Sequence, residues 1–177
     1  MSAKAWIGGD ITLDDAQMVE LRAWAVDTLP HATWHPPIER IHLTLLYHGH
    51  AESAGLRAVF ARHRLSAVTE AGRISDIEAV FTDDGAVFVV LRVDSPQLQE
   101  LHRTVRADVV DETGEMPLMK PHLAPDGSHV HRYDYSPHVT LARYATAELF
   151  ELDRDRLQQH VGTWKGRGLT VGPFRIF

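Results

Sequence analysis

Two short segments of this sequence repeat one pattern of residues that can do acid–base chemistry. His42-Leu43-Thr44-Leu45 and His138-Val139-Thr140-Leu141 each place a histidine two residues before a threonine. Residues i and i+2 of a β-strand share a face, so each segment presents an imidazole and a hydroxyl to one side and aliphatic side chains to the other. One His-x-Thr arises by chance roughly once in such a histidine-rich chain, but two copies with the same aliphatic frame are far less expected.

The repeated pattern fits the chemistry of phosphodiester cleavage. That reaction needs a base for the attacking oxygen, an acid for the departing oxygen and donors that hold the phosphoryl oxygens. Two imidazoles can serve as base and acid because an unperturbed histidine titrates near 6.5. The threonine hydroxyls can donate to the phosphate, and this scheme requires no metal or other cofactor. The alternative is a pair of half-buried strands whose polar residues face solvent.

The two segments also resemble the motifs of a known family. Ile41–Gly49 is similar to the first motif of the 2H phosphoesterase superfamily, and Tyr135–Arg143 to the second. The resemblance implies that His42 and His138 form the acid–base pair, and that Thr44 and Thr140 bind the scissile phosphate. It also implies an α+β fold of two similar lobes, each with an antiparallel sheet and flanking helices, with the active-site cleft between them.

Two branches of the superfamily are similar to this chain. One contains the RNA 2′,3′-cyclic phosphodiesterases, once called 2′-5′ RNA ligases, which resemble it in the Leu-Ala-Arg ending of the second motif. The other contains phage enzymes that degrade cyclic oligonucleotide signals. The resemblance therefore implies hydrolysis of a cyclic nucleotide phosphodiester, and it leaves open which histidine is the base.

Charge and composition narrow the substrate. The chain has 177 residues, 18 Lys plus Arg against 24 Asp plus Glu, and a formal net charge of −6. A negative protein repels a long polyanion, so we expect a small nucleotide, a cyclic oligonucleotide or an RNA 3′ end rather than extended nucleic acid. The absence of cysteine and of a long apolar run predicts a cytoplasmic protein of one domain, residues 1–177, that does not enter a membrane.

Several side chains near the motifs are candidates for substrate contacts. The aromatic residues could stack on a nucleobase, although packing in the core or at its rim is the alternative for each. Arg143 has the best motif context for a phosphate contact, while Lys120 and Arg132 are weaker candidates. The aromatic candidates are Trp34, Tyr47, Tyr133 and Tyr135.

Two other functional classes remain open. A metal-dependent hydrolase could use the histidine pairs His48/His50 and His129/His131, which have strand spacing. Supporting carboxylates are not evident, so our prediction contains no metal. A module of the same fold could instead bind a nucleotide without cleaving it. The sequence leaves the oligomeric state open.

Periodicity and turn residues predict strands and helices on both sides of a long segment, 112–137, which contains His122 and could act as a lid. The Asp83-Asp84-Gly85 turn indicates a hairpin, and Gly172-Pro173 is expected to interrupt the last strand. The expected elements are strand Lys4–Gly8, helix Asp14–Leu29, strand Ile41–Tyr47, helix Ser53–His63, hairpin strands Ser75–Phe81 and Ala86–Val93, a helix opening at Pro96, strand Pro137–Ala142, helix Ala147–His160 and strand Leu169–Phe177.

Overall fold

The computed structural model describes residues 4–117, 122–123, 129–130 and 135–177. Within them, helices and antiparallel strands alternate along the chain, which confirms the predicted α+β class. The elements are β1 (Trp6–Thr12), α1 (Asp15–Thr28), η1 (Ile38–Arg40), β2 (His42–Tyr47), α2 (Ala54–Arg62), η2 (Leu65–Ala67), β3 (Glu70–Phe81), β4 (Val87–Asp94), α3 (Pro96–Thr113), β5 (His122–Leu123), β6 (His129–Val130), β7 (His138–Tyr144), α4 (Ala147–His160), η3 (Val161–Thr163) and β8 (Gly168–Ile176).

Each α-helix starts at a polar residue that caps its first turn. The side chains of Asp14, Ser53, Ser95 and Thr146 accept a hydrogen bond from the backbone N–H three residues later. Such a cap satisfies a backbone donor that has no partner inside the helix, and it is typically worth about 1 kcal/mol. These caps explain why the predicted helix starts agree closely with the observed ones.

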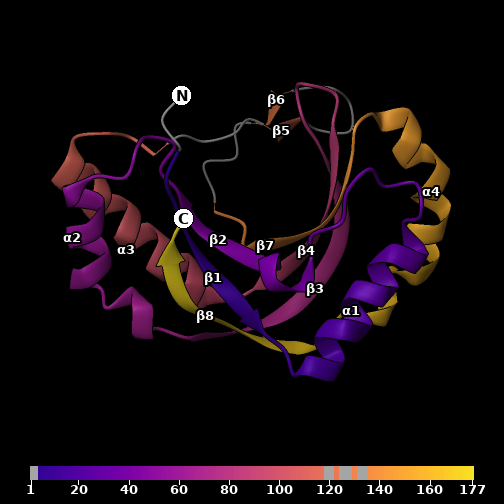
Figure 1. Ribbon diagram of the computed structural model, residues 1–177, viewed down its shortest axis with the longest axis horizontal. Helices are drawn as coiled ribbons and strands as arrows, with labels where there is room; N and C mark the ends of the chain where they lie inside the picture. Colours follow the sequence, from indigo (N-terminus) through magenta and orange to yellow (C-terminus); the bar gives the residue numbers. More distant parts are fainter. Residues whose placement is uncertain (1–3, 118–121, 124–128, 131–134) are drawn as a thin grey trace.

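The strands form two antiparallel groups that are joined at two places, between β2 and β7 and between β8 and β3. β1 pairs with β2 and β8, while β4 pairs with β3 and β7. Helices α2 and α3 lie beside the first group, and α1 and α4 lie beside the second, on the opposite side of the molecule (Figure 1). This is the predicted arrangement of two similar lobes. The register pair Leu43↔Val139 joins β2 to β7 between them.

Three expectations about the remaining segments need correction. β3 begins at Glu70, earlier than the predicted Ser75, because its first residues pair with β8. The segment 112–137 is not without regular structure: α3 continues to Thr113, and β5 and β6 pair with each other, with β5 also reaching β3. The prediction that this segment acts as a lid concerns residues that lie mostly outside the described part of the chain.

Gly172-Pro173 interrupts the pairing of β8 with β1, as predicted, but it does not interrupt the strand itself, which is the third correction. The strand runs through both residues, and its register against β1 shifts between Gly9 and Ile11 to accommodate them. Gly172 has a φ of +113°, and a Cβ there would lie 2.3 Å from the carbonyl oxygen of Val68. Glycine therefore permits both the backbone conformation and the close approach.

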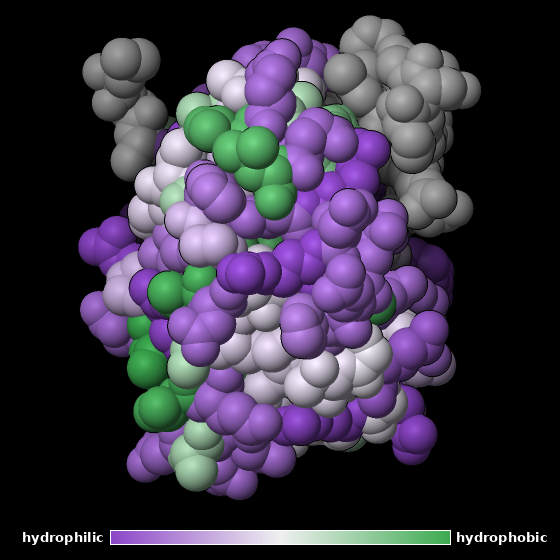
Figure 2. Space-filling view, turned by 90° about the vertical axis from the view of Figure 1, so that its right-hand side faces the viewer, coloured by the Kyte–Doolittle hydropathy of each residue, from purple (hydrophilic) through white to green (hydrophobic). Residues whose placement is uncertain are grey.

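The outer surface of the α1/α4 side is largely hydrophilic, with separate apolar spots (Figure 2). Exposed apolar residues of these helices include Val19 on α1 and Leu152 on α4. Among the described residues, none of the helices combines the length and apolar character needed to cross a membrane.

Candidate functional site

The structure brings the two His-x-Thr segments together on adjacent antiparallel strands. Leu43 of β2 lies opposite Val139 of β7. An antiparallel register continued by one residue in each direction would set His42 beside Thr140 and Thr44 beside His138. Directly opposite residues have Cβ atoms about 4.5–5.5 Å apart. The four polar side chains are half-buried on one face, while Leu43 and Val139 are fully buried on the other. The repeated pattern therefore forms a single cluster.

Both histidines are oriented by the same local hydrogen bond. Nδ1 of His42 lies 2.7 Å from the carbonyl oxygen of Arg40, and Nδ1 of His138 lies 2.9 Å from that of Ser136. A carbonyl oxygen can only accept, so Nδ1 carries the proton and donates it in both rings. Nε2 is consequently the ring nitrogen through which each histidine can accept or donate a proton.

His42 lies between an aromatic pair and an ion pair. Its ring centroid is 4.4 Å from that of Trp6, which in turn stacks on Phe177 at 3.8 Å. Asp10 lies opposite His42 in the β1–β2 register and is bonded at 3.0 Å to the guanidinium of Arg175. Burial lowers the pKa of the His42 imidazole most, and Arg175 lowers it further. The Arg40 carbonyl and Asp10 act in the opposite direction.

His138 has a different charged neighbour. Arg92 lies opposite His138 in the β4–β7 register, forms a close ion pair with Glu78 and donates to the hydroxyl of Ser136 at 3.1 Å. Ser136 is the residue whose carbonyl oxygen holds Nδ1 of His138. Arg92 thus supports the backbone segment that orients the second imidazole.

Comparisons with solved structures identify this arrangement at the level of the fold. TT0787 of Thermus thermophilus superposes with a TM-score of 0.57 and 18% identity, covering 98% of this chain and 87% of that one. Apo LigT of E. coli matches with a TM-score of 0.51 and 15% identity over 81% of this chain and 72% of that one. Usb1 of Kluyveromyces marxianus, solved with uridine monophosphate, matches with a TM-score of 0.53 and 13% identity, over 97% and 94% of the two chains. The fold is that of the 2H phosphoesterases.

Neither a protein-family model nor a curated protein sequence matches the chain. The fold likeness is therefore visible in structure at identities of 18% and below in these three comparisons. It covers nearly the whole chain in two of them, so both lobes of the 2H fold are included.

The predicted aromatic contacts occupy different places on the 2H fold. The hydroxyl of Tyr135 donates to the carbonyl oxygen of Thr44 at 3.0 Å, and its ring stacks on His102 with centroids 4.1 Å apart. Burial raises the pKa of the Tyr135 phenol, which keeps the hydroxyl a donor. Tyr135 thus links the two motif strands. Tyr47 lies opposite Trp6 in the register, at the end of β2 remote from His42.

Trp34 and Arg143 lie together at the far end of β7. Their backbones exchange hydrogen bonds of 3.1 and 2.8 Å, and the Arg143 guanidinium lies over the ring of Phe88. Arg143 follows His138 by five residues, which corresponds to roughly 17 Å along a strand. The structure therefore places this pair away from the histidines.

The described residues form no side-chain cluster that would support a metal-dependent hydrolase. No three His, Asp or Glu side chains among them gather closely enough to hold an ion. His48 is fully buried, with Nε2 3.1 Å from a carboxylate oxygen of Glu115. Lys120, His131, Arg132 and Tyr133 lie outside the described residues, as do the side chains of His122 and His129.

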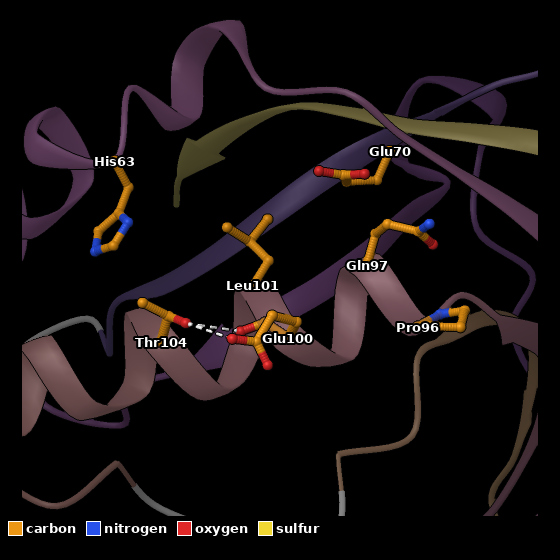
Figure 3. A pocket seen from close by; sticks show the side chains of 7 residues that line it. All are labelled: His63, Glu70, Pro96, Gln97, Glu100, Leu101 and Thr104. Carbon is orange, nitrogen blue, oxygen red and sulfur yellow. Dashed lines mark hydrogen bonds between the residues drawn. The ribbon is translucent and has the colours of Figure 1, made fainter.

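A groove of about 470 Å³ lies elsewhere, between α3, the start of β3 and the end of α2 (Figure 3). None of its lining residues comes from β2 or β7. Its polar rim includes Glu70 and Glu100, and Thr104 bonds back to Glu100 on the same helix. This acidic groove is separate from the motif face and is poorly suited to an anionic nucleotide.

The residues that surround His42 were not predicted from the sequence. Trp6, Gly8 and Asp10 alternate along β1, so they share one face, and Arg175 and Phe177 alternate in the same way at the end of the chain. That spacing was visible in the sequence. What it could not show was that β1 lies between β2 and β8, which brings both sets to His42.

Proposed function

We propose that this chain is a phosphodiesterase that hydrolyses a nucleotide phosphodiester with His42 and His138 as its acid–base pair. One observation carries the proposal: two histidines on strands that pair at Leu43↔Val139, each with Nδ1 held by a carbonyl oxygen and each two residues before a threonine on the same strand. The 2H fold supports it, because the similar structures include LigT with 3′-AMP and Usb1 with uridine monophosphate.

In the proposed reaction, Nε2 of the neutral histidine accepts the proton of a water whose oxygen bonds to phosphorus. The protonated histidine donates its Nε2 proton to the departing ribose oxygen as the old P–O bond breaks. The hydroxyls of Thr44 and Thr140 donate to the non-bridging oxygens, where charge accumulates. Each imidazole ends in the other's starting protonation state, so exchange with solvent resets the pair.

The substrate we propose is a 2′,3′-cyclic phosphate on a small nucleotide or RNA 3′ end, or a cyclic oligonucleotide. The formal charge of −6 opposes a long polyanion, whereas a few phosphates can be met by the local hydroxyls and imidazoles. No step of this scheme uses a metal ion.

The test is hydrolysis of a panel of 2′,3′-cyclic nucleotides and cyclic di- and oligonucleotides by the wild type, His42→Ala and His138→Ala. A matched control is His160→Ala, which removes an exposed histidine at the end of α4. We expect turnover by the wild type and the control, resistance to chelators and a bell-shaped pH dependence of kcat/KM.

Other outcomes select other functions. Equal turnover by all four proteins would exclude His42 and His138 as the acid–base pair. Tight binding of a cyclic nucleotide without turnover would indicate a binding module. Loss of activity with a chelator, restored by a divalent ion, would indicate a metal-dependent hydrolase.

A further inference from the structure

The side chains of Trp6, Phe177 and Arg175 form a stack beside the His42 ring. The ring centroids of His42 and Trp6 are 4.4 Å apart, and those of Trp6 and Phe177 are 3.8 Å apart with planes 7° from parallel. The guanidinium of Arg175 lies 4.4 Å above the Phe177 ring. The Phe177 ring lies farther from His42, with centroids 5.8 Å apart, so Trp6 makes the closer of the two aromatic contacts with the His42 ring.

The backbone of β1 and the end of the chain hold this stack in place. Trp6 and Phe177 exchange both backbone hydrogen bonds, at 3.2 and 2.9 Å. Gly8 leaves room for the indole, because a Cβ at Gly8 would lie 2.4 Å from Cζ3 of Trp6 and 3.1 Å from the Phe177 ring. The missing side chain lets the indole lie over Gly8 and reach His42, so this contact depends on glycine at position 8.

The charged groups facing His42 have opposing effects. Asp10 on β1 favours the imidazolium, and Arg175 on β8 disfavours it. On β7, the polar residues nearest to His42 along the antiparallel register are Thr140 and His138, which flank Val139. Because Asp10 and Arg175 are paired with each other at 3.0 Å, their effects on the imidazole partly cancel. Burial is the largest influence on the ring, and it lowers the pKa of His42.

We propose that Trp6, backed by Phe177, is a positioning residue that fixes the imidazole of His42 and shields it from water, so that His42 enters the reaction neutral, as the proton acceptor. The indole restricts rotation of the ring from one side, while the Nδ1 bond to the Arg40 carbonyl fixes its edge. His138 is then the proton donor. This inference rests on the proposed function, which does not itself assign the two roles.

The experiment compares Trp6→Ala with Trp6→Phe, and follows the His42 ring by NMR in histidine-labelled protein, with the resonance assigned by its loss in His42→Ala. In Trp6→Ala, water reaches the ring and its pKa rises toward the ordinary value of about 6.5. The acid limb of the kcat/KM profile moves to higher pH with it, because a base must be neutral. We expect a loss of about threefold or more below pH 6.5 beyond any loss at pH 8. Trp6→Phe keeps an aromatic ring beside His42. Its His42 titration and the acid limb of its kcat/KM profile should therefore stay close to those of the wild type.

An unchanged His42 titration in folded Trp6→Ala would overturn the proposal, as would an acid limb that stays in place while the NMR titration moves. If Trp6→Ala does not fold, Phe177→Ala decides. This variant removes the stacking partner of the indole and the more distant ring beside His42, so it is expected to shift the His42 titration in the same direction by less. The NMR titration requires no turnover. An inactive wild type would therefore refute the proposed function while the shielding of His42 by Trp6 is still decided.

Discussion

The two His-x-Thr strands have the same local geometry and opposite charged surroundings. In both, Nδ1 of the histidine donates to the carbonyl two residues earlier. The residue opposite each histidine on the neighbouring strand differs, however. It is a carboxylate, Asp10 on β1, for His42 and a guanidinium, Arg92 on β4, for His138. Each of these charges is paired with a group of opposite sign from a strand farther away, Arg175 on β8 for Asp10 and Glu78 on β3 for Arg92.

In the proposed reaction, one sequence pattern serves two roles. In both strands the histidine is oriented by a carbonyl two residues earlier and has a threonine two residues later. The nearest charges alone favour the opposite assignment, because a carboxylate favours an imidazolium at His42 and a guanidinium favours a neutral ring at His138. Each of these charges is paired with a counter-charge, and burial, the largest influence on His42, is what favours its neutral form. The aromatic contact of Trp6 with His42 is likewise supplied by a neighbouring strand, β1, and not by the repeated motif.

The largest expected effect concerns whether the two strands form one catalytic centre. Replacing either histidine by alanine should lower kcat by about 10²–10⁴-fold, the usual contribution of a positioned acid or base. The double variant His42→Ala/His138→Ala should lose little more than the worse single variant, because residues that act as a unit are strongly non-additive. Steady-state kinetics on a cyclic nucleotide measure all three.

Two independent sites would behave differently. Each single variant would then keep a substantial share of the activity, and the losses would combine separately in the double variant. That result would contradict a single centre built across the Leu43↔Val139 register.

The threonines test how evenly the two strands hold the phosphate. Thr44→Val and Thr140→Val keep the side-chain shape and remove the hydroxyl. A hydrogen bond to a charged group is worth about 1.5–3 kcal/mol, so each variant should lose about 10–150-fold in kcat/KM. Equal losses would indicate that both strands contact the phosphate alike, and a loss in only one would place the phosphate on that strand.

The link between the strands should have a smaller effect, on stability. Tyr135→Phe removes the hydroxyl that donates to the Thr44 carbonyl at 3.0 Å, while the ring can still stack on His102. A net hydrogen bond contributes about 0.5–1.5 kcal/mol, so the free energy of unfolding should fall by that amount. Urea denaturation measures it, and an unchanged midpoint would show that the two strands do not depend on this contact.

Local signals explain why much of the fold could be predicted. α4 has the predicted bounds Ala147–His160, and the helix faces of α1 and α3 bury Met18, Leu21, Leu98 and Val105 as their spacing indicates. The early start of β3 and the continuous β8 were missed because both depend on pairing with strands distant in the sequence.

The candidate site, like the fold, could be predicted where its signals are local and not where it depends on strand order. The spacing of His42, Thr44, His138 and Thr140 is local, and the resemblance to a known family suggested that the two pairs meet. The contacts of Trp6 and Arg175 with the His42 region arise from the order β2-β1-β8, which no spacing within one segment reveals. Non-local strand order is therefore what the sequence could not supply.

The smallest expected effect comes from removing, one at a time, the two charged side chains near His42. Asp10→Asn removes the group that favours the imidazolium, so the pKa of His42 should fall and the acid limb should move to lower pH. Arg175→Gln removes the opposing cation and leaves Asp10 unpaired, so the limb should move to higher pH. Both side chains are about half exposed, and exposed ion pairs contribute about 0.2–1 kcal/mol. Each variant should therefore change kcat/KM by no more than about fivefold, measured at a pH within the acid limb.

Two further variants make this prediction specific to the His42 strand. Asp10→Asn/Arg175→Gln removes both charges, so its acid limb should return close to that of the wild type, where the two partly cancel. Arg92→Gln removes the cation opposite His138 instead, and it should leave the acid limb set by His42 in place, whatever it does to the maximal rate. If Arg92→Gln moved that limb as far as Arg175→Gln does, both arginines would act through a general field over the whole face. The opposite charge order around the two histidines would then not distinguish them.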